Sequence, residues 1–152
     1  MTTHVFVDIK FLRGCEKLPQ YATQGSAAVD LVAAIPEGIA LIPGKEAILV
    51  GTGIALDFSR NPDMVCLVAP RSGAGHKGFC LGNTIGVIDS DYQGEIMISC
   101  VARGPDPFWI MPGDRIAQMF FVPVIRAIFG VVDEFQSATL RGAGGFGSTG
   151  KT

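Results

Sequence analysis

Short apolar runs separated by turns dominate the hydrophobic and polar pattern of the chain. Each run has the length of a strand, and several alternate with the period of two that is typical of one buried sheet face. Turns are predicted at Pro43-Gly44, Gly51-Thr52-Gly53 and Pro112-Gly113. No stretch predicts a helix of three turns. The predicted strands are 5–9, 39–42, 47–50, 54–58, 64–69, 96–101, 108–110, 116–124 and 128–132.

Many short strands at close spacing predict an all-β sandwich or barrel. The length of 152 residues fits a single domain. The composition changes near the end, where residues 141–152 are rich in glycine and bury too little to offset their backbone entropy. We therefore expect a β domain at 1–138 and a flexible glycine-rich tail at 139–152 that becomes ordered only on a ligand.

The charge balance argues against nucleic acid and membrane as partners, because the net charge is only -2. Any phosphate must be bound by locally placed basic residues. Charged residues make up 17% of the chain, against about 25% in typical domains, and 48% of residues are hydrophobic. We expect this apolar excess to be buried in a homo-oligomer.

The location of the protein is predicted from what the sequence does not contain. Neither a signal peptide nor a membrane-spanning stretch is expected. The four cysteines form no C-x-x-C pair, which predicts free thiols in a reducing cytoplasm and argues against zinc. His4 and His76 are assigned to surface or loop positions.

Four polar clusters in or beside predicted turns carry the candidate chemistry. Asp30 could face a metal, although on its own an aspartate that caps a turn at a strand end is the favoured explanation. Arg71 and Ser72 follow a strand among small residues, which suits a phosphate or an ordinary surface loop. Asp89 ends an apolar strand and can accept a proton from water or lie in a common hairpin turn. The fourth cluster, at 112–118, is a turn that leads into a strand.

The glycine-rich end also contains a motif with a known mechanism. Residues 145–152 match the P-loop pattern G-x-x-x-x-G-K-[ST]. A P-loop needs a helix immediately after the motif, and none is expected here, so we reject the corresponding NTPase fold. The glycine N–H groups, hydroxyls and basic residues of this segment still suit a polyphosphate.

Taken in order, these clusters resemble the five motifs of the trimeric dUTPase family. The resemblance covers nearly the whole chain, with motifs at 27–31, 70–75, 86–95, 112–118 and 141–148. It implies a jelly-roll, β-barrel-like fold and a homotrimer with active sites at subunit interfaces. The tail of one subunit would close a site built by the other two.

The resemblance further implies a dUTP diphosphatase, which hydrolyses dUTP to dUMP and pyrophosphate with Mg²⁺. Such an enzyme supplies dUMP for thymidylate synthesis and keeps uracil out of DNA. Asp89 would activate the attacking water, and Asp30 would hold a metal-bound water. The residues expected to contact phosphate are Arg71, Ser72, Gly73, Gln118, Arg141, Ser148 and Thr149. The residues expected around uracil and the sugar are Asn83, Val87, Ile88, Tyr92, Met97, Phe146 and Gly147.

Two rival functions remain for comparison. A dCTP deaminase would share the fold, but this chain reads Ile88-Asp-Ser-Asp-Tyr92 where the deaminase pattern has Pro-Gly-Trp after the aspartate. A non-catalytic nucleotide-binding module is disfavoured by the presence of Asp89, Arg71 and the complete tail.

Overall fold

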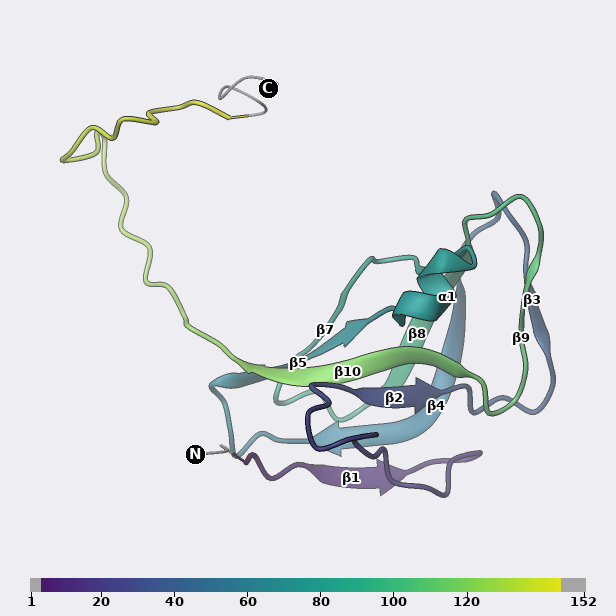
Figure 1. Ribbon diagram of the computed structural model, residues 1–152. Helices are drawn as coiled ribbons and strands as arrows, with labels where there is room; N and C mark the ends of the chain where they lie inside the picture. Colours follow the sequence, from purple (N-terminus) through teal and green to yellow (C-terminus); the bar gives the residue numbers. More distant parts are fainter. Residues whose placement is uncertain (1–3, 146–152) are drawn as a thin grey trace.

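The computed structural model describes residues 4–145, and its regular secondary structure is almost entirely antiparallel strand (Figure 1). Two four-stranded sheets and one two-stranded sheet form the body, and all their pairings are antiparallel. The elements are β1 (Asp8–Phe11), β2 (Val29–Val32), β3 (Ile39–Leu41), β4 (Ile48–Asp57), β5 (Met64–Ala69), α1 (Ser72–His76), β6 (Phe79–Leu81), β7 (Gly86–Ile88), β8 (Glu95–Ala102), β9 (Phe108–Ile110) and β10 (Arg115–Pro123).

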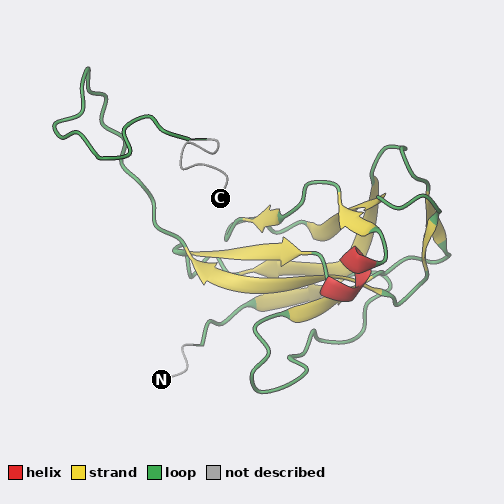
Figure 2. Ribbon diagram, turned by 45° about the horizontal axis from the view of Figure 1, so that its top comes forward, coloured by secondary structure: helices red, strands yellow, loops and turns green. Residues whose placement is uncertain are grey.

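The core lies between the two larger sheets, whose strand orders are β1-β4-β8-β6 and β2-β10-β5-β7. Alternate residues of their strands point inward, as expected for a sheet with one buried face. The fully buried residues include Val50, Ile96 and Ile98 from the first sheet and Leu31, Cys66 and Ala117 from the second. The all-β prediction is confirmed, and α1 is the only helix among the residues described (Figure 2).

The predicted turn at Gly51-Thr52-Gly53 is wrong, because β4 runs through it without interruption. The pairing of β4 with β8 changes register between Gly51 and Ala55, which marks a bulge. Gly53 has a φ of 69°, and its N–H donates to Glu95 Oε1 at 2.9 Å. A glycine at a bulge and a glycine in a turn give the same local sequence signal.

Other differences concern short strands and the segment after β10. Strands β2 and β6 were not predicted, since three or four residues carry too little periodicity, whereas β7 is the apolar strand expected before Asp89. The predicted strand at 128–132 is absent, and its apolar side chains are exposed. No strand of residues 4–145 pairs with this segment, and it extends away from the body (Figure 1).

All four cysteines are free, as predicted. Burial raises the pKa of both Cys66 and Cys100 to about 12, so these thiols stay protonated at neutral pH. None of the helices in residues 4–145 has the length and apolar character needed to span a bilayer.

Candidate active site

Asp30 and Arg71 form an ion pair at one edge of the second sheet. Asp30 lies on β2 and Arg71 immediately precedes α1, yet Arg71 Nε is 2.6 Å from Asp30 Oδ1. About a third of each side chain is exposed, 31% for Asp30 and 30% for Arg71. Because Nε is engaged, the two terminal nitrogens of Arg71 remain available for an anion.

Gln118 lies directly beside this pair. It is opposite Asp30 in the pairing of β10 with β2, and opposite Ala69 in the pairing of β10 with β5. Its Nε2 donates to the carbonyl oxygen of Pro70 at 3.0 Å, which ties β10 to the turn that carries Arg71. The structure therefore brings together three of the predicted site residues.

Ser72 and Gly73 form the exposed first turn of α1. The helix begins after Arg71, whose carbonyl oxygen accepts from the N–H groups of Ala74 and Gly75. The N–H groups before them belong to the first turn, where a helix has no internal acceptors. Ser72 and Gly73 are thus available to a ligand at the edge occupied by Arg71.

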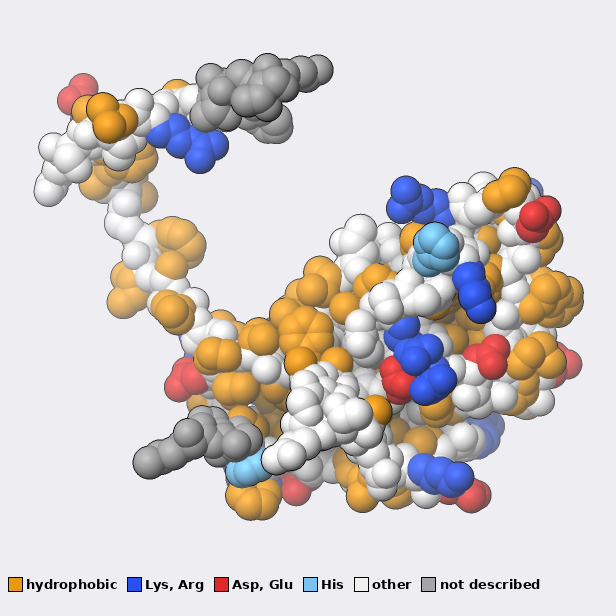
Figure 3. Space-filling view, viewed as in Figure 1, with side chains coloured by type: hydrophobic (Ala, Val, Ile, Leu, Met, Phe, Trp, Pro, Cys, Tyr) orange, Lys and Arg blue, Asp and Glu red, His pale blue; other side chains and the backbone are white. Residues whose placement is uncertain are grey.

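Arg115 is a residue of this site that sequence reasoning passed over. It lies in the predicted cluster at 112–118, and its Nη1 is 3.3 Å from Asp30 Oδ2. A cavity of about 340 Å³ opens here, and its lining includes Arg71, Lys77 and Arg115. Basic side chains gather around an acidic one beside α1 and β10 in the space-filling view (Figure 3). The edge suits an anionic ligand.

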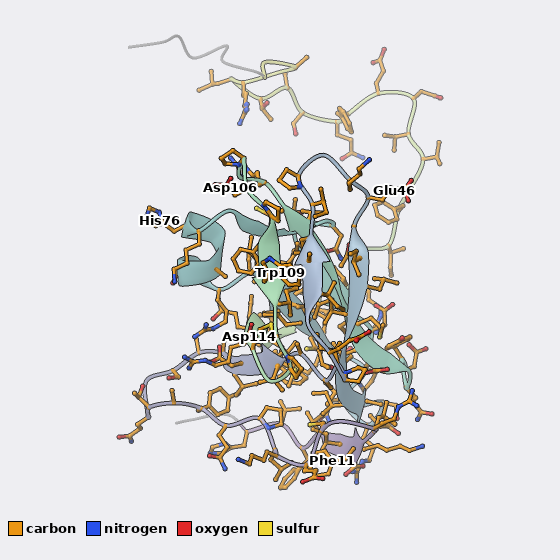
Figure 4. The ribbon with its side chains drawn as sticks, turned by 90° about the vertical axis from the view of Figure 1, so that its right-hand side faces the viewer. Phe11, Glu46, His76, Asp106, Trp109 and Asp114 are labelled. Carbon is orange, nitrogen blue, oxygen red and sulfur yellow. The ribbon has the colours of Figure 1, made fainter. Side chains whose placement is uncertain are left out.

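The turn before β10 holds Arg115 at this edge. Asp114 Oδ2 accepts from the N–H of Met111 at 2.8 Å, and the Asp114 N–H donates to the Met111 carbonyl oxygen at 3.0 Å. The Gly113 N–H donates to the carbonyl oxygen of Ala33 at 2.8 Å, just after β2. Asp114 therefore closes the turn, below β9 and Trp109 in Figure 4.

Asp89 lies at the other end of the same sheet. Ile88 pairs with Cys66, so the antiparallel register continued by one residue brings Asp89 beside Val65. Six residues lead from Val65 to Arg71, which is about 20 Å of extended chain. Asp89 and Arg71 of one chain therefore lie near opposite ends of β5.

Residues 83–97, which include most of those expected around uracil and the sugar, belong to a wide hairpin. Its arms are β6 and β8, which are paired from Phe79–Ala102 to Leu81–Cys100, and the Gly82 N–H continues the ladder to Ser99. The part at 86–88 leaves this hairpin and pairs with β5 in the other sheet. The hairpin therefore links the two sheets.

The residues predicted to surround uracil and the sugar lie on this linking segment. Val87, Tyr92 and Met97 are each between 40% and 60% exposed. Tyr92 Oη donates to the Glu95 carbonyl oxygen at 3.1 Å, which fixes the ring across the turn. Asn83 accepts at its carbonyl oxygen from the Ile85 N–H at 2.6 Å. Ile88 is half-buried against the core.

Few of the predicted tail residues can be located. Arg141 is exposed and donates from Nε to the Gly144 carbonyl oxygen at 2.8 Å, in the segment that extends away from the two sheets (Figure 1). Phe146, Gly147, Ser148 and Thr149 lie outside the described residues. His76 is exposed and points away from the body on the outer side of α1 (Figure 4), as its assignment to the surface predicted.

Comparison with known families gives a match over most of the chain. The family model described as dUTPase matches residues 16–150. A protein of Nitrosospira multiformis named deoxyuridine 5'-triphosphate nucleotidohydrolase is 53% identical over 148 residues, covering 95% of this chain and 97% of that protein. One of Enterobacter sp. with the same name is 53% identical over 135 residues, covering 88% and 87%.

Solved structures agree with the fold. A mutant of the dUTPase of Staphylococcus bacteriophage 80alpha, solved with dUpNHpp, superposes with a TM-score of 0.82 over 96% of this chain and 99% of its own, at 24% identity. A mutant dUTPase of phage phi11 of S. aureus, whose structure is described by its coordination of a structural Mg(II) ion, gives a TM-score of 0.73 over 87% and 99%, at 22% identity. The predicted jelly-roll fold is confirmed.

Proposed function

This chain belongs to the dUTPase family, and from that membership we propose that it hydrolyses dUTP to dUMP and pyrophosphate. The observation that carries the proposal is the phosphate edge, where Asp30, Arg71 and Gln118 converge from three separate segments. A carboxylate that orients an arginine beside exposed N–H groups is suited to a polyphosphate.

The proposed reaction is the attack of water on the α-phosphorus. Asp89 takes a proton from the water as the water oxygen bonds to the α-phosphorus. The bond between the α-phosphorus and the oxygen that bridges to the β-phosphate breaks at the same time. Pyrophosphate leaves with the electron pair of that bond. Phosphoryl transfer needs mainly positioning and charge stabilisation, which Arg71, Ser72, Gly73 and Gln118 would provide from the barrel.

The residues present fit Mg²⁺ only as an ion that is held mostly by substrate and water. Within residues 4–145 no group of three His, Cys, Asp or Glu side chains could enclose a metal. Asp30 accepts one hydrogen bond on each oxygen from arginine, which leaves a lone pair on each for a metal-bound water. This agrees with the preference of Mg²⁺ for water and phosphate ligands, and the bound ion would neutralise phosphate charge.

Selection of uracil and deoxyribose is assigned to the linking segment between β6 and β8. Backbone groups near Asn83 and Met97 would match the donors and acceptors of uracil. Another base would leave some of these buried polar groups unpaired, which disfavours its binding strongly. Val87 and Ile88 would line the sugar, and the ring of Tyr92 would exclude a 2′-hydroxyl. The Tyr92 bond to Glu95 supports this role, since it holds the ring in place.

A homotrimer is proposed because Asp89 and Arg71 of one chain lie near opposite ends of β5. Asp89 and Arg71 are separated by about 20 Å of strand, so a neighbouring subunit would supply Asp89 to each phosphate edge. Arg141, Ser148 and Thr149 would reach the phosphates, and Phe146 and Gly147 the base, from a third subunit. Extensive exposed apolar surface supports the assembly, including Trp109 at 62% and Phe129 at 92%.

We place the enzyme in the cytoplasm, where free thiols persist and where dUMP is needed for thymidylate synthesis. The decisive experiment incubates the purified protein with dUTP and with dCTP. Pyrophosphate release from dUTP supports the proposal, ammonia release from dCTP would indicate a deaminase, and neither product would indicate a binding module. An Asp89→Asn variant should bind dUTP but lose about 10² to 10⁴ in rate.

A further inference from the structure

Strand β10 carries an irregularity directly beside Asp30. Arg115 pairs with Val32 and Ala117 pairs with Leu31, so the register shifts by one residue between them. Ile116 and Ala117 are both buried, with exposures of 3% and 0%. A regular strand buries alternate residues on one face, so two consecutive buried residues and a register shift together define a β-bulge.

The bulge decides which way Arg115 points. On a regular strand, residues three positions apart face opposite sides of the sheet. With one extra residue between them, Arg115 and Gln118 both lie on the outer face, together with Asp30. Arg115 Nη1 then lies 3.3 Å from Asp30 Oδ2, while Arg71 Nε lies 2.6 Å from Asp30 Oδ1.

We propose that Arg115 is a positioning residue, which acts through Asp30 on the orientation of Arg71; its relevance to turnover rests on the proposed function. In residues 4–145 the side chain of Asp30 has these two arginines as its hydrogen-bond partners. A carboxylate held from both oxygens cannot rotate freely, so Arg115 fixes the plane in which Arg71 is held. The terminal nitrogens of Arg71 are thereby directed towards the cavity of about 340 Å³ that Arg71 and Arg115 help to line.

This arrangement differs from direct binding of phosphate by Arg115, and a double-mutant cycle separates the two. Arg115→Ala should lower kcat/KM for dUTP about tenfold, mainly through KM, because Arg71 contacts phosphate before and during the reaction. In an Asp30→Ala background the same change should cost less than about twofold. Equal losses in both backgrounds would overturn the proposal. The affinity for dUpNHpp gives the same comparison without turnover.

Two further variants serve as controls. Arg115→Lys keeps the charge and should recover part of the loss, since one of its N–H groups can still reach Asp30. Arg60→Ala removes an exposed arginine from a similar ion pair, with Asp8 at 2.6 Å, and should leave both kinetic constants unchanged. Melting temperatures of all variants exclude unfolding as the cause.

A spectroscopic measurement tests the positioning independently of dUTP hydrolysis. The Nε–H signal of Arg71 in the NMR spectrum of the full-length protein should shift and exchange faster in Arg115→Ala, because its partner carboxylate is less constrained. An unchanged signal would overturn the proposal whatever the activity. A wild-type protein that releases no pyrophosphate would refute the proposed function, while a shifted Arg71 signal would still support the coupling of the two arginines.

Discussion

Mixing two inactive variants should restore activity if each site combines residues from different chains. Asp89→Asn removes the proposed base, and Arg71→Ala removes the proposed phosphate ligand. Each homotrimer should be inactive because every site lacks one of the two groups. The separation of about 20 Å between Asp89 and Arg71 in one chain is the structural basis for expecting the defects to complement.

The size of the recovery follows from counting. In a cyclic trimer assembled at random from equal amounts of the two chains, a site is intact when its Arg71 comes from one type and its Asp89 from the other. Each condition holds for half of the chains, so about one quarter of the sites should be intact. The mixture should therefore reach about 25% of the wild-type rate of pyrophosphate release.

The assay requires exchange of subunits, so the variants are unfolded together and refolded, or co-expressed with two different affinity tags. Each variant taken alone through the same procedure gives the background. A mixed sample no more active than these backgrounds would show that Asp89 and Arg71 of the same chain serve one site, or that one of them serves none. Recovery far above one quarter would show that one variant was not inactive.

Three regions of the molecule and its tail give further predictions. Tyr92→Ala should raise kcat/KM for UTP relative to dUTP, and an unchanged ratio would refute the steric role of the ring. Gly53→Ala should lower the free energy of unfolding in urea by about 2 kcal/mol or more, because φ is 69° and the new Cβ would lie 2.5 Å from the Cβ of Cys15. The contribution of Cys66 and Cys100 to the free energy of unfolding should be constant below pH 9 and fall between pH 9 and about 12. Folding raises the pKa of both thiols from 9.0 to about 12, so in this range the unfolded chain loses protons that the folded chain keeps. Replacement of both by alanine should remove that contribution, as urea titrations at two pH values would reveal. A chain that ends at Leu140 should keep its melting temperature and its trimer but release pyrophosphate very slowly; full activity or loss of the trimer would each contradict this.

The hydrophobic pattern predicted β5, β8 and β10 well, because each buries one face over several periods. Strand β5 has the predicted bounds, 64–69, and β10 begins and ends within one residue of 116–124. The pattern failed where a strand is too short to show alternation, as at β6, and where a bulge resembles a turn, as at Gly53. Both failures arise because pairing with a distant strand, which local sequence does not encode, decides the outcome.

The candidate site was predictable by residue type but not by arrangement. Placing Asp30 and Arg71 in one site came from the order of the motifs, and the ion pair between them needed the structure. Arg115 was passed over because its role depends on a bulge, and the sequence of a bulge carries no distinct signal here. Its position in the cluster at 112–118 was the available hint.

The segment after β10 joins the sheets to the glycine-rich tail. It leaves the barrel at the end where Asp89 lies, since the Val124 N–H donates to the Asp63 carbonyl oxygen just before β5. From Val124 to Arg141 the chain is long enough to span about 60 Å when extended, so length alone would let the tail reach its own phosphate edge. The exposure of its apolar side chains argues against such a free path, because Ile128 and Phe135 are at least 90% exposed in the single chain.

Exposed apolar side chains of this kind mark a surface that packs against another apolar surface. A cavity of about 740 Å³ with a mostly apolar lining, between the N-terminal segment and strands β2 and β10, offers such a surface. Packing of the segment against the neighbouring subunit would bury both surfaces and fix the point from which the glycine-rich residues start. A tail anchored there would start closer to one phosphate edge than to the others, so the place where the apolar segment packs would decide which site each tail serves.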